Sequence, residues 1–137
     1  MPSLTILQHP QAISVHRLAR TPENIAKATS QLTTGLATSL VSLTIAADEI
    51  SLILPSSITP VHAADKTESG WRAFQVAGTL DFALVGILHF LTTPLKEAGV
   101  SVFCVSTYDT DWILVKEDKA EVAANLWKKA GCTVQNA

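Results

Sequence analysis

The sequence predicts an α+β fold in which short strands pair in antiparallel sheets that are covered by helices. Three observations lead to this prediction. Residues 71–135 indicate the element order β-α-β-β-α-β, and residues 1–62 indicate further short strands around one helix. Between these two segments, residues 63–70 are polar and show no periodicity. We therefore expect an N-terminal unit of residues 1–62, a linker of residues 63–70 and a C-terminal unit of residues 71–137.

Length and composition suit one domain or two very small ones. The chain has 137 residues, of which 47% are hydrophobic and 16% are charged, so it can bury a core. Its net charge is -2 and its basic residues are scattered, which argues against a nucleic-acid or membrane partner. Two cysteines provide neither a disulfide framework nor a metal-binding pair. Without a leader-like or membrane-spanning apolar run, we expect a cytoplasmic protein.

Strands flank one helix in the predicted N-terminal half. Apolar residues alternate with polar ones on both sides of the turn-like residues 9–11, which indicates two short strands. A Thr-Pro-Glu sequence is typical of a helix start and a glycine of a helix end, so we expect residues 22–34 to be helical. Alternation in residues 40–44 and 50–54 predicts a hairpin.

The C-terminal half has a clearer pattern. A strand is expected at residues 71–76, and apolar residues at helical spacing from Phe82 to Ala98 predict a long helix. Pro94 removes a backbone donor from this helix, so we expect a kink or a break near residues 90–93.

A hairpin, a second helix and a short last strand are predicted to follow. Residues 100–106 and 112–116 are apolar on both faces, which is typical of strands that are covered on both sides. Asp118 and Glu121 have the spacing of a capping box, and Gly131 marks the expected end of the second helix.

The candidate functional site is the polar turn of this hairpin, Ser106-Thr107-Tyr108-Asp109-Thr110-Asp111. Such residues also close ordinary turns by bonding their own backbone, so both interpretations stay open. A carboxylate at Asp111 could bind an ammonium group, while the backbone donors of a helix that starts at Gly86 could bind a carboxylate. We expect Asp109 to face solvent.

Ordered motifs in the C-terminal half carry a family resemblance. They are Phe82-x-x-x-Gly86-Ile87-Leu88, Pro94-Leu95-x-x-Ala98-Gly99-Val100-Ser101-Val102 and Ser106-Thr107-Tyr108-x-Thr110-Asp111-x-Ile113-Leu114-Val115. In this order they resemble the ACT domain of the CASTOR-type cytosolic arginine sensors and of small stand-alone tandem ACT proteins. The segment at residues 42–52 is similar to the first, more divergent ACT half of that group. The resemblance implies tandem ferredoxin-like (βαββαβ) units.

The resemblance also implies a regulatory protein or ligand sensor that binds an amino acid or a related small metabolite where ACT units meet. The ligand-binding residues implied by the motifs are Asp111, Thr107, Tyr108, Thr110, Gly86, Ile87, Leu88, Ser101 and Val102. In the sensors, the turn aspartate and the Ser-Val pair belong to different ACT units, so the resemblance implies a homodimer. A regulated enzyme or signalling protein would be a further partner. Where the sensors have an acid just ahead of the glycine, this chain has Ala83-Leu84-Val85.

Two other functions stay open. The chain could be a small enzyme that uses the same cleft, with Asp111, Tyr108 or His89 as acid or base. It could also be an interaction module without a ligand. No acid–base pair, nucleophile motif or phosphate-binding loop is present in the sequence. We therefore favour a non-catalytic protein without metal or cofactor, and we expect Cys104 to be a small buried residue.

Overall fold

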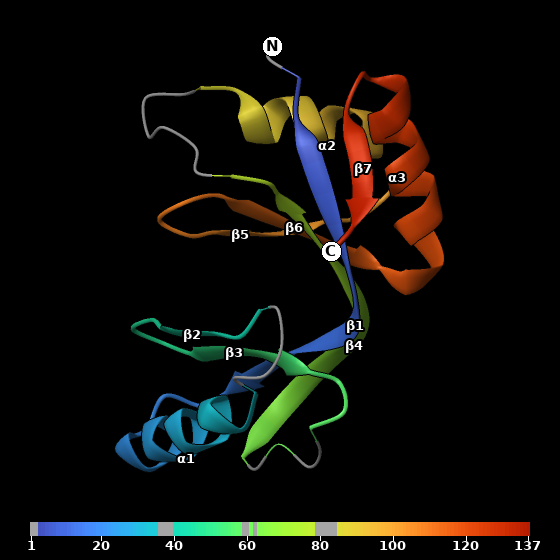
Figure 1. The fold of residues 1–137 in the computed structure, drawn as a ribbon. Helices are drawn as coiled ribbons and strands as arrows, with labels where there is room; N and C mark the ends of the chain where they lie inside the picture. Colours follow the sequence, from blue (N-terminus) through green and yellow to red (C-terminus); the bar gives the residue numbers. More distant parts are fainter. Residues whose placement is uncertain (1–2, 36–39, 59–60, 62, 79–84) are drawn as a thin grey trace. The chain divides into compact units, whose positions relative to one another are not determined.

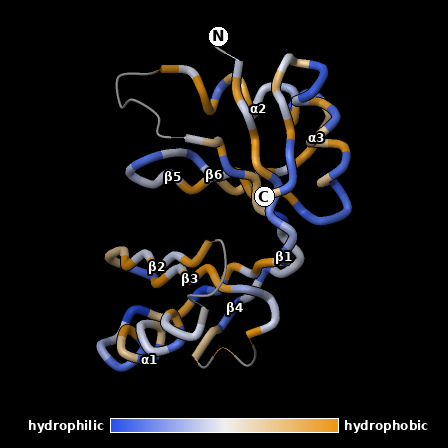
Figure 2. Tube along the Cα trace, viewed as in Figure 1, coloured by the Kyte–Doolittle hydropathy of each residue, from blue (hydrophilic) through white to orange (hydrophobic). Residues whose placement is uncertain are grey.

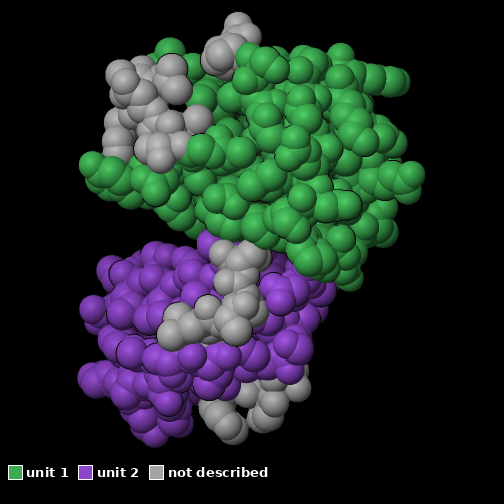
Figure 3. Space-filling model, viewed as in Figure 1, with its two compact units in different colours: residues 1–10, 72–137 green, residues 11–71 purple. Residues whose placement is uncertain are grey.

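The computed structural model describes residues 3–35, 40–58, 61, 63–78 and 85–137. The chain divides into two compact units (Figure 3), unit 1 of residues 1–10 and 72–137 and unit 2 of residues 11–71. There are two long strands, β1 (Thr5–Leu18) and β4 (Ala64–Val76). Each of them has one end in unit 1 and the other end in unit 2.

These two strands differ from the sequence-based expectation. Residues 9–11 do not form a turn but belong to β1. Pro10 is exposed there, and a proline is tolerated in a strand where its missing N–H is not needed for pairing. Residues 64–70, which we expected in a linker, belong to β4. Most of their side chains are exposed and polar, so the segment lacks the apolar alternation by which strands are recognised.

Unit 1 is a sheet with two helices on one face (Figure 1). Its strands follow the order β7-β1-β4-β6-β5, in which β7 runs parallel to β1 and β5 runs antiparallel to β6. The elements after β4 are α2 (Ile87–Glu97), β5 (Phe103–Ser106), β6 (Asp111–Lys116), α3 (Ala120–Lys129) and β7 (Thr133–Asn136). This confirms the predicted βαββαβ order, to which the structure adds β1 between β7 and β4.

The core of unit 1 lies between the sheet and the two helices. Trp127 of α3 is fully buried, and its Nε1–H donates a 2.8 Å hydrogen bond to the carbonyl oxygen of Leu91 in α2. Its ring packs edge-on against Phe74 of β4 with 4.9 Å between the ring centroids. Figure 2 shows hydrophobic and hydrophilic residues alternating along α3, as expected for a helix with one buried face.

Helix α2 continues through Pro94, so of the kink or break expected near residues 90–93 the break does not occur. Leu91 and Leu95, on either side of the proline, are both fully buried, and this packing holds the helix together where one backbone hydrogen bond is missing. Phe82 lies outside the described residues, and Val85 is 86% exposed, so the apolar face of the helix begins only at Ile87.

The start of α3 also differs from the expectation. A short 3₁₀ turn at Glu117–Lys119 precedes the helix, and no side chain caps the helix at Lys119. The expected capping box of Asp118 and Glu121 therefore does not form. The predicted end is confirmed, because Gly131 has a φ of 97°, a backbone conformation that glycine adopts without strain.

Unit 2 has the strand order β2-β3-β1-β4, with β2 (Ser42–Ile45) and β3 (Ile50–Pro55) forming the predicted hairpin. Helix α1 (Pro22–Leu32) is capped by Thr21, whose hydroxyl oxygen accepts a 3.0 Å hydrogen bond from the Asn24 N–H. Among the residues that the structure describes between β3 and β4, none is helical. Unit 2 therefore shows only one of the two helices of the βαββαβ pattern in its described part.

Candidate ligand-binding site

The β5–β6 turn is held in place by the side chain of Thr110. The backbone N–H of Thr107 donates to the Thr110 carbonyl oxygen at 2.8 Å, which closes the turn. Thr110 is buried, and its hydroxyl donates a 2.6 Å hydrogen bond to the carbonyl oxygen of Val76, the last residue of β4. The turn therefore lies at the strand end from which the chain continues toward α2.

Asp111 is the half-buried first residue of β6. It lies opposite Ser106 in the hairpin, and its Oδ1 accepts a 2.7 Å hydrogen bond from the Ser106 hydroxyl. The turn-closing role that the sequence left open is thus present in the structure. An ionised carboxylate has about four acceptor sites, so this bond leaves others for a ligand. Next to it, Tyr108 is 81% exposed and Asp109 is exposed.

Gly86 begins α2 in a left-handed conformation, with a φ of 81°. As a glycine, Gly86 has no side chain with which to cap this end of the helix. Ile87 is buried in the unit 1 core and Leu88 packs against that core, so a ligand would meet their backbone N–H groups rather than their side chains.

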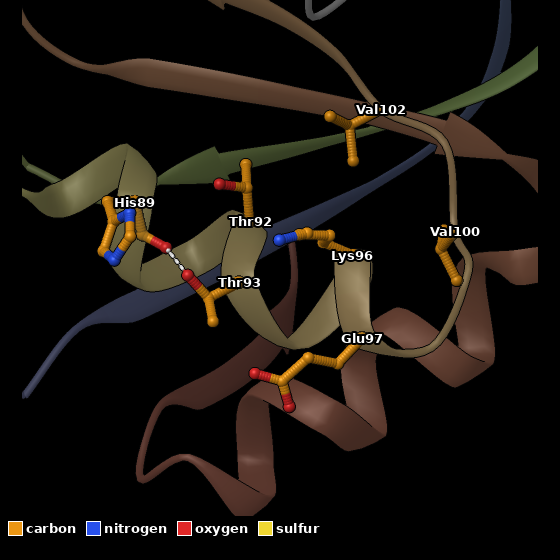
Figure 4. Close-up of a pocket in the computed structure, with 7 residues that line it drawn as sticks. All are labelled: His89, Thr92, Thr93, Lys96, Glu97, Val100 and Val102. Atoms are coloured by element: carbon orange, nitrogen blue, oxygen red, sulfur yellow. Dashed lines mark hydrogen bonds between the residues drawn. The ribbon is translucent and has the colours of Figure 1, made fainter.

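Ser101 and Val102 precede β5. Ser101 is exposed, and Val102 is half-buried against the unit 1 core. Val102 lines a cavity of about 330 Å³ beside α2 (Figure 4), together with His89, Thr92, Thr93, Lys96, Glu97 and Val100. Gly86 lines a different cavity of about 460 Å³, together with His89, Phe90, Thr93, Pro94, Glu97 and Ala130.

The structure thus separates the predicted site residues into three places of unit 1: the turn, the start of α2 and the segment before β5. The side chains of Thr92 and Lys96 were missed in the sequence, although their spacing of four residues places them on one face of a helix. A search of the long helix for polar residues at that spacing would have found them.

Outside the turn, the surroundings of Cys104 and His16 shift the pKa values of these side chains. Cys104 is exposed on β5, so the expectation that it is buried is wrong: Cys104 and Ser106 are exposed, while Phe103 and Val105, on the opposite face of the strand, are half-buried. Partial burial and the nearby Asp111 carboxylate raise the pKa of its thiol. His16 of unit 2 is buried, which lowers its pKa, and its Nδ1 lies 2.9 Å from Thr67 Oγ1.

Within the described part of the chain, no three side chains of the His, Cys, Asp and Glu types come together as a metal site. No helix in that part is long and apolar enough to cross a membrane. His89 is an exposed residue of α2.

Comparison with known proteins identifies the fold. Residues 66–127 match the family model of the ACT domain. None of the curated proteins matches this sequence. A crystal structure of a protein from Agrobacterium tumefaciens is similar, with a TM-score of 0.79 and 24% identity over 100% of this chain and 96% of that one.

Two similar structures come from aspartate kinases. The ligand-free regulatory subunit of aspartate kinase from Thermus thermophilus has a TM-score of 0.69 and 10% identity over 91% of this chain and 95% of that one. The aspartate kinase of Clostridium acetobutylicum has a TM-score of 0.68 and 16% identity over 92% of this chain and 34% of that one, so this chain spans about a third of that enzyme. With the βαββαβ order of unit 1, these matches show an α+β ferredoxin-like ACT fold.

Proposed function

We propose that this protein is a non-catalytic regulatory or sensor protein that binds an amino acid at an interface between ACT units. ACT domains are regulatory amino-acid-binding modules, and the matched model spans the chain from β4 to α3. The Thermus thermophilus structure is described as a regulatory subunit, and the Clostridium acetobutylicum kinase as an allosteric enzyme. The further partner of this protein would then be an enzyme or signalling protein that it regulates.

The hydrogen bond from Thr110 to Val76 is the observation that carries this proposal. Together with the pairing of β4 with β6, it fixes the turn that contains Asp111 at the end of β4, the strand that leads to the helix start at Gly86. In the proposed complex, the Asp111 carboxylate binds the ammonium group of the amino acid. The first backbone N–H groups of α2 bind its α-carboxylate, which the helix dipole also favours.

A homodimer would complete the site. Strand β5 ends the strand order, and among the described strands it pairs only with β6. A strand at the end of a sheet is suited to pairing with a second copy. In such a two-fold dimer, Ser101 and Val102 of one chain would face the Asp111 turn and the Gly86 helix start of the other, which forms two equivalent sites.

Arginine, the ligand of the CASTOR-type sensors, is not required by this proposal. Val85 stands directly before Gly86, where those sensors have an acid, and its side chain is 86% exposed. The residue next to the helix start therefore offers no carboxylate to a guanidinium group.

A thermal-shift screen against the twenty standard amino acids tests the proposed function. A ligand that binds the folded state raises the melting temperature, by an amount that grows with its concentration. Mass spectrometry of the incubated ligand should show it unchanged. A melting temperature that no amino acid raises would overturn the proposal in favour of an interaction module, and turnover of the ligand would favour an enzyme.

The proposed site between two chains can be tested separately, by mixing two variants of the full chain. Asp111→Ala alone should weaken binding by about 1.5 to 3 kcal/mol, and Ser101→Trp alone should block the site. Their mixed dimer should regain one intact site of its two, measured by titration calorimetry. Sedimentation across a dilution series should also show that the ligand strengthens dimerisation. A chain that stays monomeric at every concentration and still binds the amino acid would contradict the dimer.

A further inference from the structure

We propose that Lys96 selects an acidic amino acid, by binding the side-chain carboxylate of the ligand in the cavity beside Val102. The inference rests on the proposed function, because it assigns the part of the ligand that the Asp111 turn and the Gly86 helix start do not bind. It adds a residue that lies outside the ligand-binding set implied by the motifs.

The position of Lys96 is the first argument. Figure 4 shows the ammonium group of Lys96 and the hydroxyl group of Thr92 on the side of α2 that faces Val102, whereas the Glu97 carboxylate lies on the other side of the helix. In the described part of the chain, Lys96 has no ion-pair partner. Lys96 is an exposed cation at this cavity, and Glu97, the acid that also lines it, lies on the other side of α2.

The lining of the cavity is the second argument. Val100 and Val102 form an apolar wall beside Lys96, and the cavity of about 330 Å³ is at the lower end of the range for small-molecule sites. The Thr92 hydroxyl donates its proton to the Leu88 carbonyl oxygen at 2.7 Å, so binding of a ligand carboxylate in this cavity is assigned to Lys96 and not to Thr92. A short aliphatic chain that ends in a carboxylate fits these surroundings, with its methylene groups on the valines and its charge on Lys96.

The place of the cavity in the proposed dimer is the third argument. Val102 belongs to the segment that would face the Asp111 turn of the other chain. A ligand whose ammonium group and α-carboxylate are bound by one chain would therefore extend its side chain toward the Lys96 cavity of the other. Val85 offers no acid next to the helix start, and Lys96 places its ammonium group on the side of α2 that faces Val102, so an anionic side chain would meet a positive charge there.

Lys96 also has an ordinary structural role, because a cation in the last turn of a helix is favourable for the helix dipole. Lys128 occupies the last turn of α3 in the same way and provides a matched control. Loss of a dipole interaction alone lowers the stability of either variant and leaves the choice of ligand unchanged.

Titration calorimetry of the intact protein with glutamate, glutamine, aspartate and asparagine tests the inference. The wild type should bind one of the two acids about tenfold or more tightly than its neutral amide, the size expected for a charge-assisted hydrogen bond. Lys96→Met should remove that preference by weakening the acid and not the amide, and Lys128→Met should retain it. A preference that survives in Lys96→Met, or a wild type that binds only neutral or basic amino acids, would overturn the inference while the proposed function stands.

A second measurement tests the Lys96 site if the proposed function itself fails. If no amino acid binds the wild type, glutarate and succinate are titrated and the methyl resonances of Val100 and Val102 are followed by NMR. Shifts that disappear in Lys96→Met would support a carboxylate site at Lys96 without a sensor function. Methyl resonances that do not move at millimolar concentrations of either dicarboxylate would overturn the inference as well.

Discussion

The hydroxyl group of Thr110 donates a hydrogen bond of 2.6 Å to the carbonyl oxygen of Val76, across 34 positions of the sequence. Both residues are buried, so water does not replace this bond when it is lost. This bond adds to the pairing of β4 with β6 in fixing the candidate turn at the end of β4.

We expect Thr110→Val to lower the free energy of unfolding by about 1 to 3 kcal/mol. Valine has a similar shape but no hydroxyl, so the Val76 carbonyl oxygen loses its partner in a buried place. Urea unfolding measures the loss. Thr133→Val, at an exposed position of β7, is the control and should change stability by no more than about 0.5 kcal/mol. Equal effects of both substitutions would contradict an anchoring role of Thr110.

A comparison of Asp111→Ala with Ser106→Ala separates ligand binding from turn closure. Both variants lose the hydrogen bond between the two side chains, but only Asp111→Ala loses the carboxylate. We expect Asp111→Ala to weaken amino-acid binding by about 1.5 to 3 kcal/mol, and Ser106→Ala to bind almost as the wild type does. Asp109→Ala should also have little effect. Equal losses in the Asp111 and Ser106 variants would show that the aspartate only closes the turn.

Ile6→Ala tests whether the first strand residues belong to the core of unit 1. Ile6 is 2% exposed and packs in the same cluster as Trp127, so its truncation should cost about 2 to 5 kcal/mol of stability. Ile45→Ala, whose side chain is 43% exposed on β2, should cost much less. Denaturant unfolding followed by tryptophan fluorescence compares the two. A cost at Ile6 no larger than at Ile45 would contradict the place of β1 in unit 1.

Burial of His16 predicts a dependence of stability on pH. Burial lowers the pKa of His16 in the folded protein below the usual value near 6.5, so the unfolded chain takes up a proton at higher pH than the folded one. The contribution of His16 is therefore full above about pH 6.5 and is lost as the pH falls from there toward the folded-state pKa.

Unfolding at pH 7.5 and at pH 5.5 measures this effect. The difference in stability between the two pH values should be smaller in His16→Gln than in the wild type. His89→Gln, at an exposed histidine, should keep the wild-type difference. A pH dependence that His16→Gln leaves unchanged would show that other groups cause it.

Local patterns in the sequence were sufficient to predict most of the helices and strands of unit 1. These patterns are the apolar periodicity of α2 and α3, the glycine after α3 and the apolar residues of β6. Each depends only on residues that are close together in the sequence. The same patterns failed for residues 64–70 of β4, where exposed polar side chains form a strand through pairing and side-chain bonds to the distant β1, such as Arg17 to Asp65. They also failed for Pro94, because packing on both sides keeps the helix intact.

The sequence by itself determined the βαββαβ order of unit 1, the hairpin and the polar turn with Asp111, since each follows from neighbouring residues. Only the tertiary structure decided that residues 1–10 belong to the same unit as residues 72–137, that Thr110 bonds to Val76, and that Lys96 shares a cavity with Val102. The physical reason is that these relations join segments with no common local pattern. Strand pairing, a buried hydroxyl and the packing of a helix beside a strand bring them together, and a window of neighbouring residues contains none of this information.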